Sequence, residues 1–375
     1  MKKINLCFPF VGDSVGGSHI SSLILVKELA KSEIYRPLVF LHKTGVLSDY
    51  LDTNNIQYIV VDRENVIVND GPILKQIVKM IKAALSLYSV LLKHQVKIIH
   101  TNDIRMHYTW LIAAKVSGCK FVWHQRTADD SRRNSWYSFF SDAIITISEH
   151  CKSSLPSLMS RHSAVVYDPF VFDSIDHERI AYRKATLEDV CPDENCFLVI
   201  YVGKFTKQKR PKLFLDIANI VKRESNKKVI FCMFGNSKVE LDKDIKEYSK
   251  KLNIDDVLIL KGVKQPIQPW INASDLLVAP AINEGLGRTL VEAQALNVAV
   301  VATNHGGHVE VIQHGVTGYL ADDNPASFAN YILSLINDEK KKNQIAKNAK
   351  AHANKEFSVV QHINKVLSIY DNVLK

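Results

Sequence analysis

The sequence predicts an α/β protein composed of two doubly wound domains, each built on a parallel sheet. At 375 residues the chain is longer than one hydrophobic core comfortably supports, so two domains are expected. In both halves, short segments rich in Val, Ile and Leu alternate with amphipathic helical segments. Strands that are apolar on both sides are typical of parallel sheets covered by helices on each face. The composition, 46% hydrophobic and 23% charged, is that of a globular protein.

The first half begins with a strand at 4–10, a Gly16-Gly17 turn and a helix at 18–31. The same alternation continues to residue 170, with long helices at 73–94 and 106–116. Further strands are expected at 38–42, 58–61, 98–102, 121–124, 143–147 and 164–167. We therefore expect a Rossmann-like N-terminal domain over residues 1–170.

The second half restarts with an apolar strand at 197–203. Further strands are expected at 229–234, 257–260, 275–280 and 298–302. Between the halves, residues 171–195 are charged and lack the pattern, which indicates a linker. A second Rossmann-like domain is expected at 196–355. The final segment, 356–375, is helical with no strand after it, and can pack back on the N-terminal domain.

The cysteines and the N-terminus bound the class of protein. Six cysteines are scattered, and only Cys191 and Cys196 lie close together, without a second pair or a His cluster that would complete a zinc site. No metal is implied. The apolar stretch at 4–10 is too short for a signal peptide, and no apolar run reaches roughly 18 residues, the length of a membrane span. We expect a cytoplasmic protein.

The net charge of +9 suits an anionic partner. Residues 1–170 contain 20 Lys and Arg against 14 Asp and Glu. The basic residues are dispersed and no nucleic-acid recognition motif occurs, so nucleic acid is not expected as a partner. An anionic membrane surface, here the inner face of the plasma membrane, and a phosphorylated substrate remain open as partners. A charge that serves solubility alone is the alternative.

Two segments bear on membrane binding. The segment 132–140 combines Arg132 and Arg133 with aromatic residues. It can contact an anionic membrane or be an ordinary surface segment, and the sequence favours neither. The helix at 74–92 has a stripe of apolar residues beside three lysines. This pattern favours an amphipathic helix whose apolar stripe faces the core, and membrane contact is the alternative. The stripe consists of Leu74, Val78, Ile81, Leu85, Tyr88 and Leu92.

The most specific motif runs from Asn283 to Ala293. A strand leads into a glycine-rich turn, and a helix opens at about Arg288. Glycines allow a ligand to approach the backbone, and the N–H groups at a helix start favour an anion. Glu284 and Glu292 flank the turn at the carboxyl end of the sheet, where their carboxylates can accept hydrogen bonds from sugar or ribose hydroxyls.

This motif resembles the signature of family 4 glycosyltransferases, retaining enzymes of the GT-B fold. The resemblance continues at 300–312, which is similar to the family's Gly-Gly-x-x-Glu block, and at 315–320. Upstream, 202–209 is similar to the family's Gly-Arg-x4-Lys element. The resemblance covers nearly all of the second half and is looser in the first, where it includes Gly16-Gly17 and Trp123-His124.

The resemblance implies roles for residues of the second half. Glu292 binds the ribose hydroxyls of a nucleotide, and Glu284 binds hydroxyls of the transferred sugar. Lys204 and Lys209, beside Gly203, neutralise the diphosphate, whose charge grows as the glycosidic bond breaks. Backbone and side-chain contacts to the donor come from Gly285, Leu286, Gly287, Thr289 and Leu290.

In the first half the resemblance implies that Gly16 and Gly17 approach the diphosphate and that His124 contacts the donor sugar near its reacting carbon. The implied reaction retains the anomeric configuration, with no metal or other cofactor. A uridine diphosphate sugar is the favoured donor, and a glycan or lipid-linked acceptor is expected, in cell-surface polysaccharide or lipopolysaccharide biosynthesis.

The sequence departs from the family at a few positions. Lys204 replaces an arginine, which keeps the charge but loses the bidentate fork. Asn297 stands where Gly is common, and Asn can adopt a left-handed turn. A dehydrogenase is disfavoured because no Gly-x-Gly-x-x-Gly turn follows either first strand. An epimerase of the same fold, or an inactive homologue that binds nucleotide sugars, remains an alternative.

Overall fold

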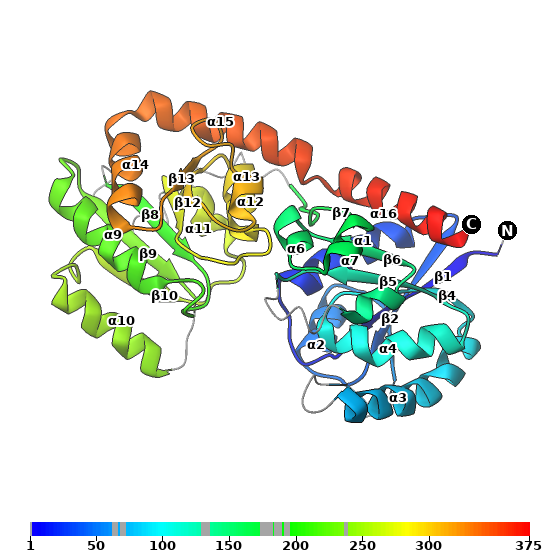
Figure 1. Cartoon of the computed structure of the whole chain (residues 1–375). Coiled ribbons are helices and arrows are strands. Elements are labelled where there is room, and N and C mark those ends of the chain that lie inside the picture. Colours follow the sequence, from blue (N-terminus) through cyan, green and yellow to red (C-terminus); the bar gives the residue numbers. More distant parts are fainter. Residues whose placement is uncertain are drawn as a thin grey trace. The chain divides into compact units, whose positions relative to one another are not determined.

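The chain folds into two compact units, which the computed structural model describes for residues 2–61, 67, 73–128, 136–172, 183, 190, 196–235 and 239–375. Unit 1 comprises Met1–Phe170 together with Val359–Lys375, and unit 2 comprises Val171–Ser358. Figure 1 labels their helices and strands. Both units are the doubly wound α/β domains that the sequence predicts.

In unit 1 the described strands form one parallel sheet of seven, in the order β3-β2-β1-β4-β5-β6-β7. The order reverses direction at β1 and β4, and ligands of open α/β sheets bind at the carboxyl ends of strands beside such a switch. The strands are β1 (Ile4–Phe10), β2 (Tyr35–Leu41), β3 (Tyr58–Val60), β4 (Val96–Thr101), β5 (Lys120–Gln125), β6 (Ala143–Thr146) and β7 (Ser163–Val165).

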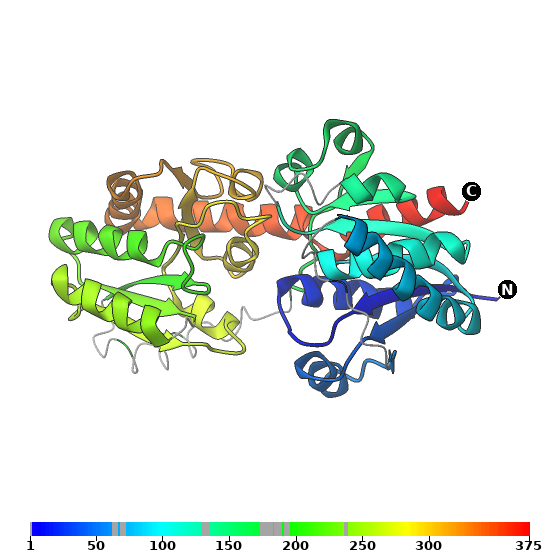
Figure 2. The same ribbon diagram turned by 60° about the horizontal axis from the view of Figure 1, so that its bottom comes forward.

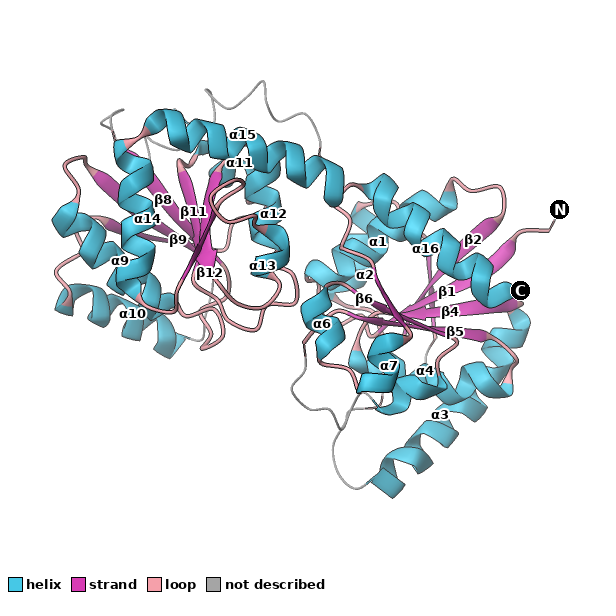
Figure 3. Ribbon diagram, turned by 45° about the horizontal axis from the view of Figure 1, so that its top comes forward, coloured by secondary structure: helices cyan, strands magenta, loops and turns pink. Residues whose placement is uncertain are grey.

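Helices cover both faces of this sheet (Figure 3). On one face, α3 (Ile73–Lys93) and α4 (Ile104–Val116) bury a core that includes Met80, Leu87 and Trp110. The opposite face is covered by α1 (Gly17–Ala30), α2 (Val46–Thr53) and α16 (Val359–Leu374). Shorter helices follow β5 and β6: η1 (Trp136–Phe140), α6 (Glu149–Ser153) and α7 (Ser157–Arg161).

The expected orientation of α3 is wrong. Its predicted core stripe is exposed, with Leu74 at 75% and Leu85 at 74% relative exposure. The buried face is instead formed by Met80, Ala83, Ala84, Leu87 and Leu91. Both stripes are apolar, and the two alanines allow the helix to lie close to the sheet and to α4, which the larger stripe would prevent.

The last helix, α16, belongs to unit 1. It buries Val366 and Tyr370 in the same core as α1 and α2. The Tyr35 hydroxyl donates a hydrogen bond of 2.6 Å to Asp371 Oδ1, and His362 Nδ1 lies 2.8 Å from the Tyr167 carbonyl oxygen. The end of the chain thus completes the fold of the first unit.

In unit 2 the described strands form one parallel sheet of six, in the order β10-β9-β8-β11-β12-β13. The direction again reverses, here between β8 and β11. The strands are β8 (Phe197–Val202), β9 (Val229–Phe234), β10 (Leu258–Gly262), β11 (Leu276–Ala279), β12 (Ala299–Thr303) and β13 (Tyr319–Ala321).

One core of unit 2 is formed with α9 (Pro211–Glu224), α10 (Val239–Lys251), α14 (Pro325–Asn337) and α15 (Glu339–Glu356). The helices α9 and α10 lie side by side in Figures 1 and 2. On the other face of the sheet are α11 (Gln268–Ala273) and α12 (Arg288–Ala295), with the short α13 (His308–Val311) beside them (Figure 3).

Two local conformations follow from the chemistry of single residues. Asn297 adopts a φ of 60°, the left-handed turn expected of an Asn in a glycine position. Ser148 caps α6 through a hydrogen bond of 2.9 Å that its hydroxyl accepts from the Cys151 N–H. Most of the predicted linker, 171–195, and the basic residues Arg132 and Arg133 lie outside the described residues. Among the helices that the structure describes, none has the length and apolar character needed to cross a bilayer.

Candidate active site

The glycine-rich turn between β11 and α12 is held by close backbone contacts. Gly287 is the N-cap of α12 with a φ of 95°, a conformation that favours glycine. The Gly307 N–H donates a hydrogen bond of 2.9 Å to the Glu284 carbonyl oxygen. A Cβ at Gly307 would lie 2.4 Å from the Gly285 carbonyl oxygen, so only glycine fits. The Gly306-Gly307 turn therefore packs against the glycine-rich turn and holds its backbone in place.

The Glu284 carboxylate meets the basic loop that follows β8. Lys209 Nζ lies 2.6 Å from Glu284 Oε1, and the Glu284 side chain is 14% exposed. The Tyr201 hydroxyl donates to the carbonyl oxygens of Lys204 and Lys209, each at 3.3 Å, which fixes the loop. The Lys204 side chain is exposed. The predicted sugar-binding carboxylate and one predicted diphosphate-binding lysine are thus brought together at the carboxyl end of β8 and β11.

These groups line a small recess of about 10 Å³ in unit 2. Its walls include Thr289 and His308 as well as Glu284 and Lys209. His308 was missed by the sequence analysis, although it lies within the Gly-Gly block that carried the resemblance. It is buried, which lowers its pKa to about 4 and keeps the ring neutral at pH 7.

Glu292 lies one helical turn further along α12 and does not line this recess. Its side chain is 20% exposed, and Oε1 is 3.9 Å from the Arg288 guanidinium. Burial raises the pKa of Glu292, and the Arg288 charge opposes that rise. A desolvated carboxylate is a strong hydrogen-bond acceptor.

Two other residues predicted to bind the sugar donor have side chains that a ligand does not reach. The side chains of Leu286 and Leu290 are buried, at 2% and 0% exposure. The Leu290 N–H already donates a hydrogen bond of 3.0 Å to the Gly287 carbonyl oxygen. Leu290 therefore shapes the helix start, while the backbone of Gly285, Leu286 and Gly287 forms the turn itself.

In unit 1, His124 lies near the carboxyl end of β5 and is fully buried. His100 Nε2 is 3.0 Å from His124 Nδ1, and His100 Nδ1 is 2.5 Å from the Tyr370 hydroxyl. The pKa values of both histidines are lowered well below the ordinary range, first by burial and then by the Arg126 charge. Both rings are therefore neutral.

Arg126 determines which nitrogen of His124 carries the proton. Its Nη2 lies 3.3 Å from His124 Nδ1, and a guanidinium can only donate. His124 Nδ1 must then accept, which places the proton on Nε2, a nitrogen without a partner among the described residues. His100 Nε2–H then donates to His124 Nδ1, and the Tyr370 hydroxyl donates to His100 Nδ1. The guanidinium itself is held by an ion pair with Asp168 and by Asn102 Oδ1 at 2.9 Å.

Gly16 and Gly17 begin α1 directly after β1. A Cβ at Gly16 would meet only His19 Nδ1 at 3.8 Å, an ordinary contact, so sterics within unit 1 do not require this glycine. The preceding loop is tied down by Arg105, which forms a bidentate pair with Asp13 at 2.7 and 3.2 Å. The turn is thus held in a fixed position at the carboxyl ends of the strands, where His124 also lies.

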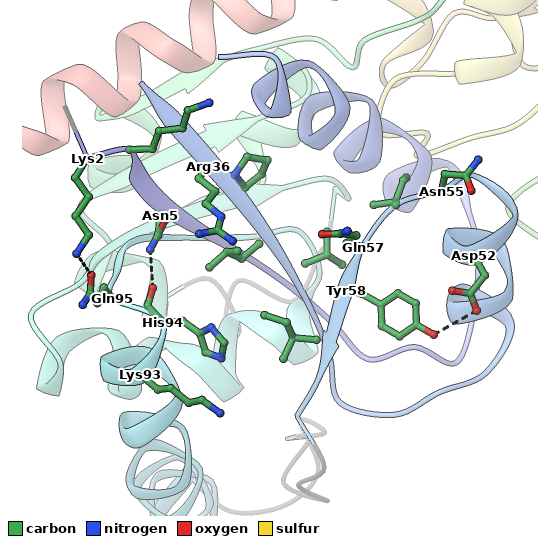
Figure 4. Close-up of a pocket in the computed structure, with 16 residues that line it drawn as sticks. Lys2, Asn5, Arg36, Asp52, Asn55, Gln57, Tyr58, Lys93, His94 and Gln95 are labelled. Atoms are coloured by element: carbon green, nitrogen blue, oxygen red, sulfur yellow. Dashed lines mark hydrogen bonds between the residues drawn. The ribbon is translucent and has the colours of Figure 1, made fainter. Parts of the chain in front are cut away.

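A larger recess of about 1130 Å³ lies at the amino ends of the unit 1 strands, opposite the end where His124 lies. Figure 4 shows its lining, with Arg36, Lys93 and His94 around it. None of the predicted site residues lines this recess. Within the described ranges, no group of three or more His, Cys, Asp and Glu side chains is placed to hold a metal ion.

Comparison with known proteins identifies glycosyltransferases as relatives of this chain. The family described as glycosyl transferases group 1 matches residues 185–352. The UDP-Gal:alpha-D-GlcNAc-diphosphoundecaprenol alpha-1,3-galactosyltransferase of Escherichia coli is 24% identical over 364 residues, which cover 92% of this chain and 90% of that protein. The capsular polysaccharide biosynthesis glycosyltransferase CapM of Staphylococcus aureus is 28% identical over 243 residues, 63% of each chain.

Solved structures show the same fold over the whole chain. HepE of Anabaena, solved in complex with UDP and glucose, superposes with a TM-score of 0.81 at 20% identity, covering 98% of this chain and 99% of that one. A glycosyltransferase from Rickettsia africae superposes with a TM-score of 0.83 at 20% identity over all of both chains.

The two parallel-sheet domains have the GT-B fold, and the family match together with the named relatives identifies a glycosyltransferase. Residues 185–352 match the group 1 glycosyl transferases, and the relatives named above are glycosyltransferases of the family 4 type that the motifs resemble.

Proposed function

We propose that this glycosyltransferase moves a sugar from a uridine diphosphate sugar onto a glycan or lipid-linked acceptor in the assembly of a cell-surface polysaccharide. The observation that carries the donor site is the pair formed by Glu284 and Lys209 beside the turn that opens α12. The relative that matches 92% of the chain is named as a galactosyltransferase acting on a GlcNAc-diphosphoundecaprenol. The relative that matches 63% is named for capsular polysaccharide biosynthesis, and HepE was solved with UDP and glucose.

In the free protein, Lys209 and Glu284 neutralise each other at 2.6 Å. When the donor binds, the ammonium turns to the diphosphate with Lys204, and the carboxylate accepts hydrogen bonds from the sugar hydroxyls. The backbone of Gly285 to Gly287 approaches the same part of the donor. Glu292 accepts the ribose hydroxyls at the other end. In unit 1, His124 and the Gly16-Gly17 turn are the proposed donor contacts, with His124 Nε2–H as a hydrogen-bond donor.

The proposed reaction retains the anomeric configuration. The acceptor hydroxyl oxygen bonds to the anomeric carbon from the face that the diphosphate leaves, while the bond from that carbon to the phosphate oxygen breaks. The acceptor proton passes to an oxygen of the leaving diphosphate. The lysines stabilise the charge that develops there, so the proposal needs neither a protein nucleophile nor a metal ion.

A panel of uridine, guanosine, adenosine and thymidine diphosphate sugars tests the proposal. We expect a uridine diphosphate sugar to raise the melting temperature most, and to be consumed only when an acceptor is present. A sugar isomerised without an acceptor would support the epimerase instead, and binding without turnover on any acceptor would support an inactive homologue. The relatives, which carry transferase names, do not favour these alternatives.

A further inference from the structure

Helix α3 has two apolar faces, and only one is covered. The face that packs on the sheet and on α4 presents Met80, Ala83, Ala84, Leu87 and Leu91, each at most 2% exposed. The other face presents Leu74 and Leu85, about three-quarters exposed, together with Leu92 at 53%. The remaining exposed residues of this face are Ile77, Val78, Ile81 and Tyr88. We call these seven residues the α3 stripe.

Soluble monomers rarely leave such a contiguous apolar surface uncovered. Helix α3 lies on the outside of unit 1 (Figure 3), and the stripe extends from the first to the last turn of its 21 residues. Phe139 and Phe140 of η1 are also more than half exposed, and their neighbour Tyr137 packs against the same core as α3. The exposed apolar residues of α3 and η1 thus belong to elements that pack on the same core of unit 1.

The charges beside the stripe have one sign. Lys75, Lys79 and Lys82 each follow a stripe residue by one position, and Lys93 follows Leu92. The helix contains no Asp or Glu. Lysines in this position extend their apolar stems along the stripe and hold their ammonium groups beside it.

The basic surface continues past the end of α3 into the recess of Figure 4. Lys93 and Arg36 lie on its wall with His94. The pKa of His94 is lowered by burial and by the charges of Lys93 and Arg36, as expected where positive charge collects. Anionic groups would therefore be attracted along α3 and at its end.

We propose that the α3 stripe docks unit 1 on the headgroup region of an anionic lipid bilayer. The apolar residues enter the interface and the lysines bind lipid phosphates, the arrangement of an interfacial amphipathic helix. A second copy of the chain fits less well, because a symmetric contact through this face would bring the lysines of both copies together. The proposal deepens the proposed function, since it would place the enzyme where a lipid-linked acceptor lies.

Flotation of the full chain with phosphatidylcholine vesicles, with and without phosphatidylglycerol, tests the docking. We expect wild type to float with the anionic vesicles and to be released by salt. L74N and L85N should each lower the partition coefficient roughly tenfold or more. Charge removal by K75Q, K79Q or K82Q should lower it by roughly fivefold each. V360N is the matched control, because Val360 is 67% exposed on α16 on the opposite face of the sheet.

Equal flotation of L85N and wild type would overturn the proposal. So would wild-type flotation that is the same with and without phosphatidylglycerol. So would a wild-type dimer in light scattering that L85N converts to a monomer, because a second copy would then cover the stripe. UDP affinity, measured in parallel without vesicles, separates this outcome from failure of the proposed function. Docking mutants that keep full UDP affinity but lose flotation support the proposal.

Discussion

Replacing Glu292 by alanine removes the carboxylate proposed to bind the ribose. A hydrogen bond to a charged group contributes about 1.5–3 kcal/mol. The Glu292 side chain is only 20% exposed and its pKa is raised by burial, so it is poorly hydrated before the ligand arrives. We therefore expect the full range to apply, which weakens UDP binding by about 10-fold to 150-fold.

Titration calorimetry with UDP measures this loss. Glu224→Ala is the control, because Glu224 ends α9 in the same unit with a side chain 48% exposed. The raised pKa means that the folded protein binds a proton more readily than the unfolded chain, so stability falls as pH rises from the ordinary carboxyl pKa through the raised one. Glu292→Gln should therefore melt no lower than wild type at neutral pH. UDP affinity unchanged in a folded Glu292→Ala protein would refute the ribose assignment.

Three further predictions follow from the same contacts. Gly307→Ala places a Cβ 2.4 Å from the Gly285 carbonyl oxygen, so we expect a stability loss of about 1–3 kcal/mol in urea unfolding with weaker UDP binding; an unperturbed variant would contradict the tight packing. His362, whose pKa is lowered to about 4 by burial, should cost about 2 kcal/mol of stability between pH 7 and pH 5, because the unfolded chain takes up the proton first, and His362→Asn should lose this pH dependence. Sugar transfer should survive EDTA, whereas loss that magnesium or manganese restores would show a metal requirement.

Much of the fold was predictable because it depends on local patterns. Apolar strands separated by helices predicted two parallel sheets, and the glycine motif predicted the turn that opens α12. The cap at Ser148 and the left-handed Asn297 follow from the chemistry of single residues. The α3 orientation could not be predicted in this way. Periodicity shows that a helix has apolar faces, but only the packed sheet selects which face is buried.

The surroundings of His124 were also beyond the sequence analysis. Tyr370 reaches His100 across 270 residues, because α16 returns to unit 1 after the whole of unit 2. Arg126 stands only two residues from His124, yet nothing in its neighbours indicates a buried ion pair with Asp168. Such contacts depend on how strands are ordered in the sheet, and no spacing in the sequence reports that order.

We propose that this chain transfers a sugar from a uridine diphosphate donor bound by the second unit. The most direct measurement combines the best-binding donor with a lipid-linked acceptor and determines the product by mass and by NMR of the anomeric proton. We predict one sugar added per UDP released, with the donor's anomeric configuration, and a severe loss in Glu284→Ala. Free sugar alone, an inverted linkage, or full activity in Glu284→Ala would contradict the proposed retaining transfer.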